Sequence, residues 1–113
     1  YRNSAPNQTG LTASVGLQTM YTAPTAGEYR LMWETIATVS GTGNVNFNYN
    51  WTDEAGGPSI SVGLTLTVGQ RAPSVGAMNA QTFHVAAGQA IQWSTTYTAT
   101  GTYAVYVVLE RLS

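Results

Sequence analysis

The chain has 113 residues, of which 43% are hydrophobic and only 8% charged, with no cysteine and a formal net charge of −1. This length predicts one domain, and the lack of cysteine excludes a disulfide scaffold and a thiolate metal site. The weak charge and the four dispersed arginines argue against a nucleic-acid partner, and no apolar run is long enough for a membrane helix, so we predict no membrane insertion.

Alternation of apolar and polar residues, which is typical of β-strands, runs through nearly the whole chain, and no segment has helical periodicity. The expected strands, in chain order, are residues 9–21, 28–40, 44–51, 59–68, 81–86, 90–98 and 102–112. Tight turns are expected between them, including a hairpin at residues 41–43, and residues 69–80 form the one long loop. Seven to eight strands with such spacing predict an all-β fold, an antiparallel jelly-roll-like β-sandwich. We assign residues 9–113 to this single domain and residues 1–8 to an N-terminal extension or linker.

Two of the expected strands are apolar on both faces. The last strand directs Tyr103, Val105, Val107 and Leu109 to one side and Ala104, Tyr106, Val108 and Leu112 to the other. The strand over 28–40 likewise carries Met32 and Ile36 on the side opposite its core residues. A second buried face in a chain this short predicts contact with another copy of the protein. The predicted oligomer interface is therefore Met32, Ile36, Ala104, Tyr106, Val108 and Leu112. In the alternative interpretation a loop or the strand over 9–21 covers this face.

The strand over 44–51 alternates without a fault and places an uncharged polar row, Asn44, Asn46, Asn48 and Asn50, on its outward side. A row of amides can hydrogen-bond sugar hydroxyls, so these residues are a possible ligand-facing surface. The alternative is a neutral, solvated face of the sheet.

No constellation of residues predicts catalysis, a cofactor or a metal. His84 is the only histidine and has no carboxylate near it in sequence, so we expect a surface or interface residue rather than part of a triad. The adjacent Asp53 and Glu54 are read as turn residues rather than calcium ligands. Glu28, Arg30 and Glu34 share one strand face, where an ion-pair row or a charged rim of an interface is expected rather than a glycosidase pair.

The segment over residues 21–33 resembles a turn of trimeric jelly rolls. In complement-globular-head and tumour-necrosis-factor-like families an apolar residue, a proline, a glycine and a tyrosine precede a long strand, and Tyr21, Pro24, Gly27 and Tyr29 match them here. The final strand lies where those families place a closing strand that lines the trimer axis.

The second half of the chain is more similar to compact, cysteine-free domains of bacteriophages and prophages. The matching residues are Val85, Ala87, Gly88, Ile91, Trp93, Ser94, Thr95, Gly101, Thr102, Tyr103, Val105, Val107, Leu109, Glu110 and Leu112. The resemblance implies a fibre, spike or head-appendage domain, usually a homotrimer, and carries over no catalytic residues.

Together these features predict a non-enzymatic virion structural protein, either a capsid decoration or a head- or tail-fibre module at the virion surface. The expected partners are two further copies of the chain, capsid or other virion proteins, and in one variant a host-surface glycan. The alternatives are a carbohydrate-binding module or a bacterial surface adhesin domain, located outside the cell or on the bacterial surface. An enzyme using Glu28 and Glu34 is the least favoured hypothesis.

Overall fold

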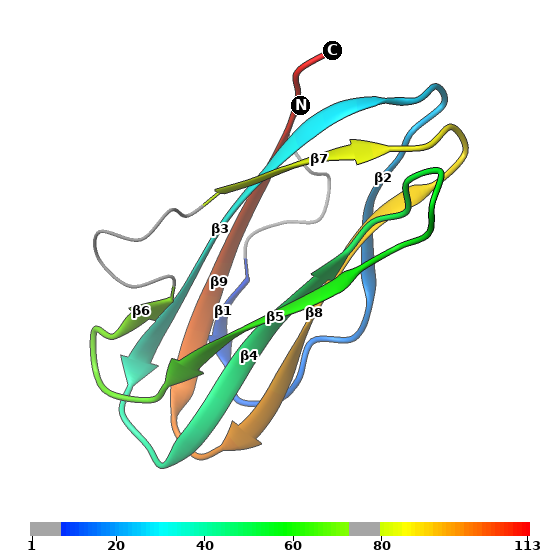
Figure 1. Cartoon of the computed structure of the whole chain (residues 1–113). Helices are drawn as coiled ribbons and strands as arrows, with labels where there is room; N and C mark the ends of the chain where they lie inside the picture. The colour runs from blue at the N-terminus through cyan, green and yellow to red at the C-terminus, as the bar shows by residue number, and fades with distance from the viewer. Residues whose placement is uncertain (1–7, 73–79) are drawn as a thin grey trace.

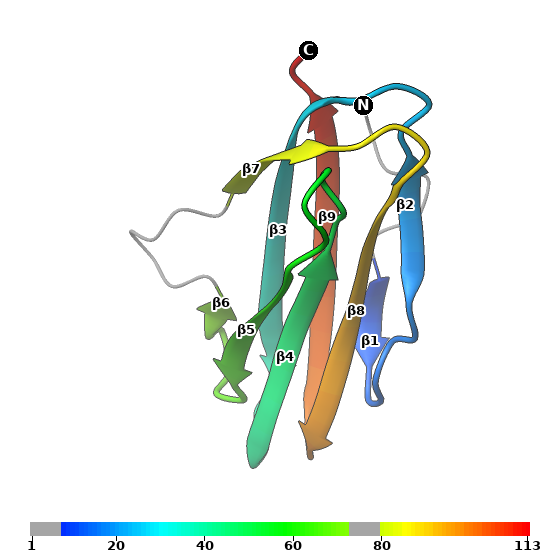
Figure 2. The same ribbon diagram turned by 45° about the vertical axis from the view of Figure 1, so that its right-hand side comes forward.

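The computed structural model describes residues 8–72 and 80–113, which form two antiparallel β-sheets packed face to face (Figures 1 and 2). The strands are β1 (Gln8–Leu11), β2 (Gln18–Thr22), β3 (Gly27–Val39), β4 (Gly43–Asn50), β5 (Ser59–Thr65), β6 (Arg71–Ala72), β7 (Ala80–Val85), β8 (Ala90–Ala99) and β9 (Thr102–Arg111). Sheet A has the order β1-β9-β3, with β6 and β7 both paired to the far side of β3. Sheet B has the order β2-β8-β4-β5.

The connectivity is that of a jelly roll. The chain crosses to the other sheet after β1, β2, β3, β5, β7 and β8, and only β4–β5 and β6–β7 stay within one sheet. Since β6 and β7 occupy one edge position beside β3, each sheet is four strands wide. The predicted antiparallel jelly-roll-like sandwich is therefore confirmed, with nine strands in the described residues where seven to eight were expected.

The prediction of a single strand over residues 9–21 is wrong. This part of the chain forms β1 in sheet A and β2 in sheet B, and the segment between them crosses the edge of the sandwich. Residues 41–43 do not form a hairpin, because they carry the chain from sheet A to sheet B. The alternation of residues 59–68 predicts that Val68 faces inward, but β5 ends at Thr65 and Val68 is 64% exposed. The alternation of residues 28–40 predicts that Val39 shares the core side of Tyr29 and Leu31, but a bulge before Val39 leaves it 54% exposed.

The expected domain boundary and long loop lie partly outside the described residues. Residues 1–7 of the expected extension are not described, and Gln8 is already the first residue of β1. The expected loop over 69–80 contains β6 and the start of β7, and residues 73–79 lie outside the described part.

The core between the sheets is a continuous array of aromatic rings. Phe47 of β4 stacks between Trp93 of β8 and Trp33 of β3, with ring centroids 5.6 Å apart in both pairs. Tyr49 lies 4.9 Å from Trp33 and extends the array toward the edge between β5 and β7. Aromatic pairs at these separations contribute attraction beyond the area they bury. The alternation of residues 44–51 and 90–98 predicts that Phe47, Tyr49 and Trp93 face inward, and all three are buried.

A buried hydrogen-bond chain fastens the β1–β2 connection to the opposite strands. The Tyr103 hydroxyl donates to the Ala13 carbonyl at 2.6 Å, so it must accept from the Thr95 hydroxyl, which lies 2.7 Å away. The Thr95 oxygen in turn accepts from the Val15 N–H at 2.7 Å. Burial raises the pKa of the Tyr103 phenol above its usual value of 10.0, so the hydroxyl remains a donor near neutral pH.

Candidate functional site

The outer face of sheet A places the predicted interface residues of β3 and β9 side by side. In the register of these two central strands Met32 lies opposite Val108, Glu34 opposite Tyr106, and Ile36 opposite Ala104. Directly opposed side chains of adjacent strands are in contact distance of each other. The apolar residues that interrupt the two strands' polar alternation therefore form one patch rather than two separate ones.

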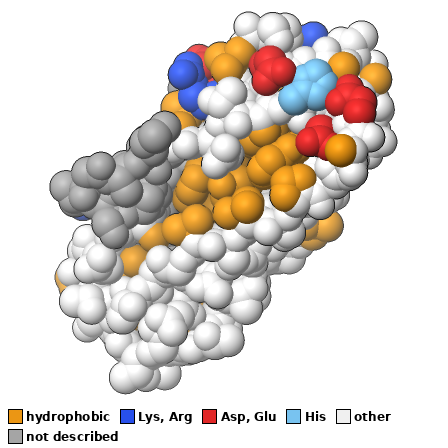
Figure 3. Space-filling model, in the orientation of Figure 1, with side chains coloured by type: hydrophobic (Ala, Val, Ile, Leu, Met, Phe, Trp, Pro, Cys, Tyr) orange, Lys and Arg blue, Asp and Glu red, His pale blue; other side chains and the backbone are white. Residues whose placement is uncertain are grey.

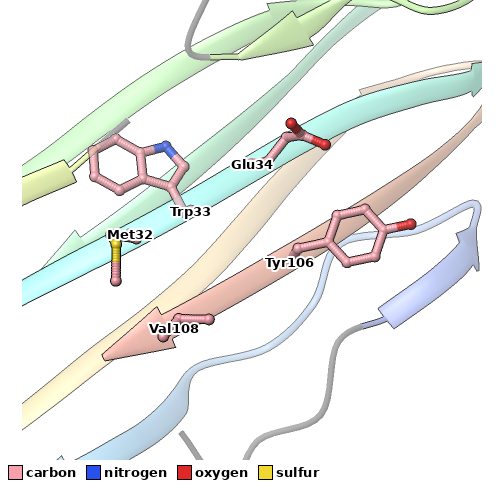
Figure 4. Close-up of a pocket in the computed structure, with 5 residues that line it drawn as sticks. All are labelled: Met32, Trp33, Glu34, Tyr106 and Val108. Atoms are coloured by element: carbon pink, nitrogen blue, oxygen red, sulfur yellow. The ribbon is translucent and has the colours of Figure 1, made fainter. Parts of the chain in front are cut away.

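This patch is open to solvent at its centre. Tyr106 and Val108 are 38% and 36% exposed, and they lie on neighbouring outward positions of a central strand, whereas the more exposed Leu17, Val39, Val68 and Leu112 lie outside the strands or at a strand end. Together with Met32, Trp33 and Glu34 they line a shallow hollow of about 160 Å³ whose surface is almost entirely apolar (Figure 4). The Trp33 ring itself belongs to the core. We call Met32, Tyr106 and Val108 the apolar patch.

The other three predicted interface residues differ in how much surface they offer. Ile36 is half-buried beside the patch. Ala104 is 0% exposed in the single chain and offers no surface of its own to a partner. Leu112 is 44% exposed but follows the end of β9, and its N–H donates to the Glu28 carbonyl of β3.

Charged side chains surround the apolar patch in pairs of opposite sign. Arg30 forms an ion pair with Glu110, the residue opposite it on β9. At the other end of the patch Arg71 of β6 lies 3.4 Å from Glu34. Arg30 and Glu34 therefore pair with residues of neighbouring strands rather than in a row along β3, and the expected rim of an interface stays a prediction. Each pair is about 40–50% exposed and stabilises the single chain by only about 0–1 kcal/mol.

His84 lies between two carboxylates that the sequence did not associate with it. Its Nδ1 is 2.8 Å from a carboxylate oxygen of Glu28 on β3, and its Nε2 is 3.0 Å from one of Glu54 in the β4–β5 turn. The hydrogen bonds to Glu54 and Glu28 raise the pKa of His84, and the bond to His84 lowers the pKa of Glu54. Figure 3 shows the histidine flanked by acidic side chains at one end of the molecule.

Sheet B presents a very different surface. None of β2, β4, β5 and β8 contains a charged residue. The four asparagines of β4 lie on its outward side between hydroxyl, amide and glycine positions of β5 and β8. Asn48 donates to Thr96 at 3.0 Å and accepts from Ser61 at 2.8 Å, so part of this polar row is bonded within the sheet.

The acidic residues considered for metal binding and for glycosidase chemistry contact other groups of the protein. Within 8–72 and 80–113, no group of three or more His, Cys, Asp or Glu side chains is arranged to hold a metal ion. The Asp53 carboxylate accepts from the Ala55 N–H at 2.8 Å, as an Asx turn does. The carboxylates of Glu28 and Glu34, considered above as a glycosidase pair, have different partners: Glu28 contacts His84, and Glu34 contacts Arg71.

In the same part of the chain, no helix has the length and apolarity needed to cross a bilayer. No protein-family model and no curated protein sequence matches this chain, so the comparisons assign it to no family.

Proposed function

We propose that this chain is a non-catalytic structural module that assembles with copies of itself through the outer face of sheet A. The observation that carries the proposal is the apolar patch of Met32, Tyr106 and Val108 at the centre of that face. Each large apolar side chain moved from water into an interface contributes about 1.5–3 kcal/mol when fully transferred. The patch is too small alone, since a standard interface covers roughly 800 Å² per partner, so the contact includes the charged rim.

The rim favours a second copy of the same chain as the partner. Arg30 and Glu110, and likewise Arg71 and Glu34, place both signs of charge within each pair. A face that carries both signs in pairs can meet its own copy without juxtaposing like charges. A partner whose surface carries a strong charge of one sign would find no surface of opposite net charge on this face.

The trimer and the virion surface are the more specific part of the proposal. The trimer derives from the likeness of the turn over residues 21–33 to complement-globular-head and tumour-necrosis-factor-like jelly rolls. The virion surface derives from the likeness of residues 85–112 to phage appendage domains, which are also usually homotrimers. A capsid decoration or fibre module binds and stabilises without turnover. A neutral, hydroxyl-rich surface suits this role because few of its groups titrate or are screened by salt.

Sedimentation equilibrium of the intact protein at micromolar concentration tests the assembly. We expect a mass of three times the 12.0 kDa of the chain. Val108→Asp should shift the protein to the monomer, because the interface would bury an unpaired carboxylate. The matched change Asn46→Asp on sheet B should leave the assembly intact. A monomeric wild-type protein, or equal assembly of both variants, contradicts the proposal.

The outer face of sheet B supports a second candidate function, binding of a neutral glycan. The supporting observation is the row of Asn44, Asn46, Asn48 and Asn50 on a sheet without charged residues. Glycan-array binding that disappears in Asn46→Ala and Asn48→Ala, and persists in Glu34→Gln on sheet A, would favour this function. Absence of binding to every uncharged glycan would exclude it.

A further inference from the structure

The edge of the sandwich between β5 and β7 is apolar and only partly closed. Figure 3 shows hydrophobic side chains exposed in this region, next to the histidine and its acidic neighbours. Trp51, directly after β4, stacks on Phe83 of β7 with ring centroids 4.3 Å apart. Ile60 and Val62 of β5 are also only partly buried against the core. What holds the β4–β5 turn against β7 therefore decides how much of this edge meets water.

Two polar contacts join the turn to β7 and to Ala86, the residue directly after it. The Ala86 N–H donates to the Thr52 carbonyl at 2.9 Å. The second contact is His84, which lies on β7 in register with Glu28 of β3 and reaches Glu54 of the turn. Since Glu28 belongs to sheet A and the turn belongs to sheet B, the histidine connects the two sheets across the open edge.

The chemistry of this contact depends on one proton. Both partners of His84 are carboxylates, which in the ionised form only accept hydrogen bonds. A neutral imidazole has one N–H and can serve only one of them, while its other nitrogen presents a lone pair to the second carboxylate. Only the imidazolium donates from both Nδ1 and Nε2, at the observed 2.8 and 3.0 Å.

We propose that His84, Glu28 and Glu54 form a proton-controlled closure of the β5–β7 edge. With His84 protonated, the turn is held on β7 and the Trp51–Phe83 stack is covered. With His84 neutral, the imidazole keeps its shorter bond to Glu28 inside the sheet. The Glu54 side chain, 64% exposed and on a turn, then separates from the histidine. The turn is left with the Ala86–Thr52 bond and the Trp51–Phe83 stack, so it loosens and Trp51 becomes more accessible to water. This inference does not depend on self-assembly.

The other charged groups near this end do not replace the histidine. Arg30, the next outward residue of β3, pairs with Glu110 of β9. Arg111 contacts the Ser113 carbonyl and the Thr25 hydroxyl. The Asp53 carboxylate is bonded within the turn. No other residue of β7 itself is charged.

The sign of the pH dependence follows from the two pKa shifts. A histidine whose pKa is raised in the folded protein stabilises the contact below 6.5, and this stabilisation is lost as the pH rises through the raised value. Glu54, whose pKa is lowered, contributes above 4.5 and loses its contribution as the pH falls through the lowered value. The edge is therefore closed from below pH 4.5 to above pH 6.5 and opens under more alkaline conditions.

Acrylamide quenching of tryptophan fluorescence tests the proposal. Trp33 and Trp93 are buried in the core, so the quencher reports mainly on Trp51. We expect quenching to increase with pH in a single step. Its midpoint should match the pKa of His84 measured by NMR, which should lie above 6.5.

Two variants separate this mechanism from a general pH effect. In Glu54→Gln the amide can accept from one form of the imidazole and donate to the lone pair of the other, so the step should disappear and the pKa of His84 should fall toward 6.5. Glu34→Gln, a matched change at a carboxylate that contacts Arg71, should keep the step. Quenching that stays flat with pH in the wild type, or a step unchanged in Glu54→Gln, would overturn the proposal.

Discussion

Removal of the Tyr103 hydroxyl tests how the crossing segment between β1 and β2 is held. In Tyr103→Phe the ring keeps its place in the core, and two groups lose their partner. The Ala13 carbonyl belongs to an exposed residue and can bond to water instead. Thr95 is 4% exposed, so no water replaces the acceptor that its hydroxyl proton loses, although its oxygen still accepts from the Val15 N–H. A buried donor without an acceptor costs about 1–3 kcal/mol, so we expect the free energy of unfolding to fall by that amount.

Tyr29→Phe is the matched control for this measurement. Tyr29 is also fully buried, but its hydroxyl has no hydrogen-bond partner among the described residues. Its removal should leave stability unchanged or slightly increased, because no bond is lost. Urea denaturation at one fixed protein concentration compares the two, with stability read from midpoints at an unchanged m-value. If Tyr103→Phe lost no more stability than Tyr29→Phe, the hydrogen-bond chain would not hold the segment as described.

Two further substitutions test the core and a turn. Thr35→Val should stabilise the protein by about 1 kcal/mol, since the Thr35 hydroxyl is fully buried and has no partner among the described residues. Thermal unfolding would show a higher midpoint, and a lower one would mean that the hydroxyl is bonded. Gly101→Ala should destabilise by about 1–3 kcal/mol, because Gly101 has φ +97° and a Cβ there would lie 2.7 Å from the Val39 carbonyl oxygen. Denaturation at an unchanged midpoint would contradict this conformation of the β8–β9 turn.

The alternation of apolar and polar residues correctly predicted which side chains of β4 and β8 face the core. The inward residues Val45, Phe47 and Tyr49 of β4 are all apolar and lie in the core. In β8 the inward Ile91, Trp93 and Tyr97 also pack in or against the core, and Thr95 is the one polar residue among the inward positions of that strand.

Alternation failed for residues 9–21, which were predicted to be one strand. β1 and β2 lie in different sheets, and the segment that crosses between them is not a strand. It also failed at Val39 and Val68, since a bulge and a strand end shift the phase of the pattern.

The candidate sites differ in how far the sequence could reach them. The outward positions of Met32 and Val108 follow from the period of two, but their direct opposition depends on the β3–β9 register. The contacts of His84 could not be predicted, because Glu28 and Glu54 are 56 and 30 residues away along the chain. Only the jelly-roll connectivity brings these three residues together.

The central claim is that a second copy of the chain covers the apolar patch in solution. The chain has no cysteine, so Val108→Cys introduces a single thiol of nearly the same size at the centre of the patch. Asn46→Cys places a matched thiol on the outer face of sheet B. The measurement is the rate of maleimide labelling of each thiol over a range of protein concentrations. We predict that the thiol at position 108 is protected at high concentration and becomes reactive on dilution, while that at position 46 reacts at one rate throughout. Equal and concentration-independent labelling at both positions would contradict the account.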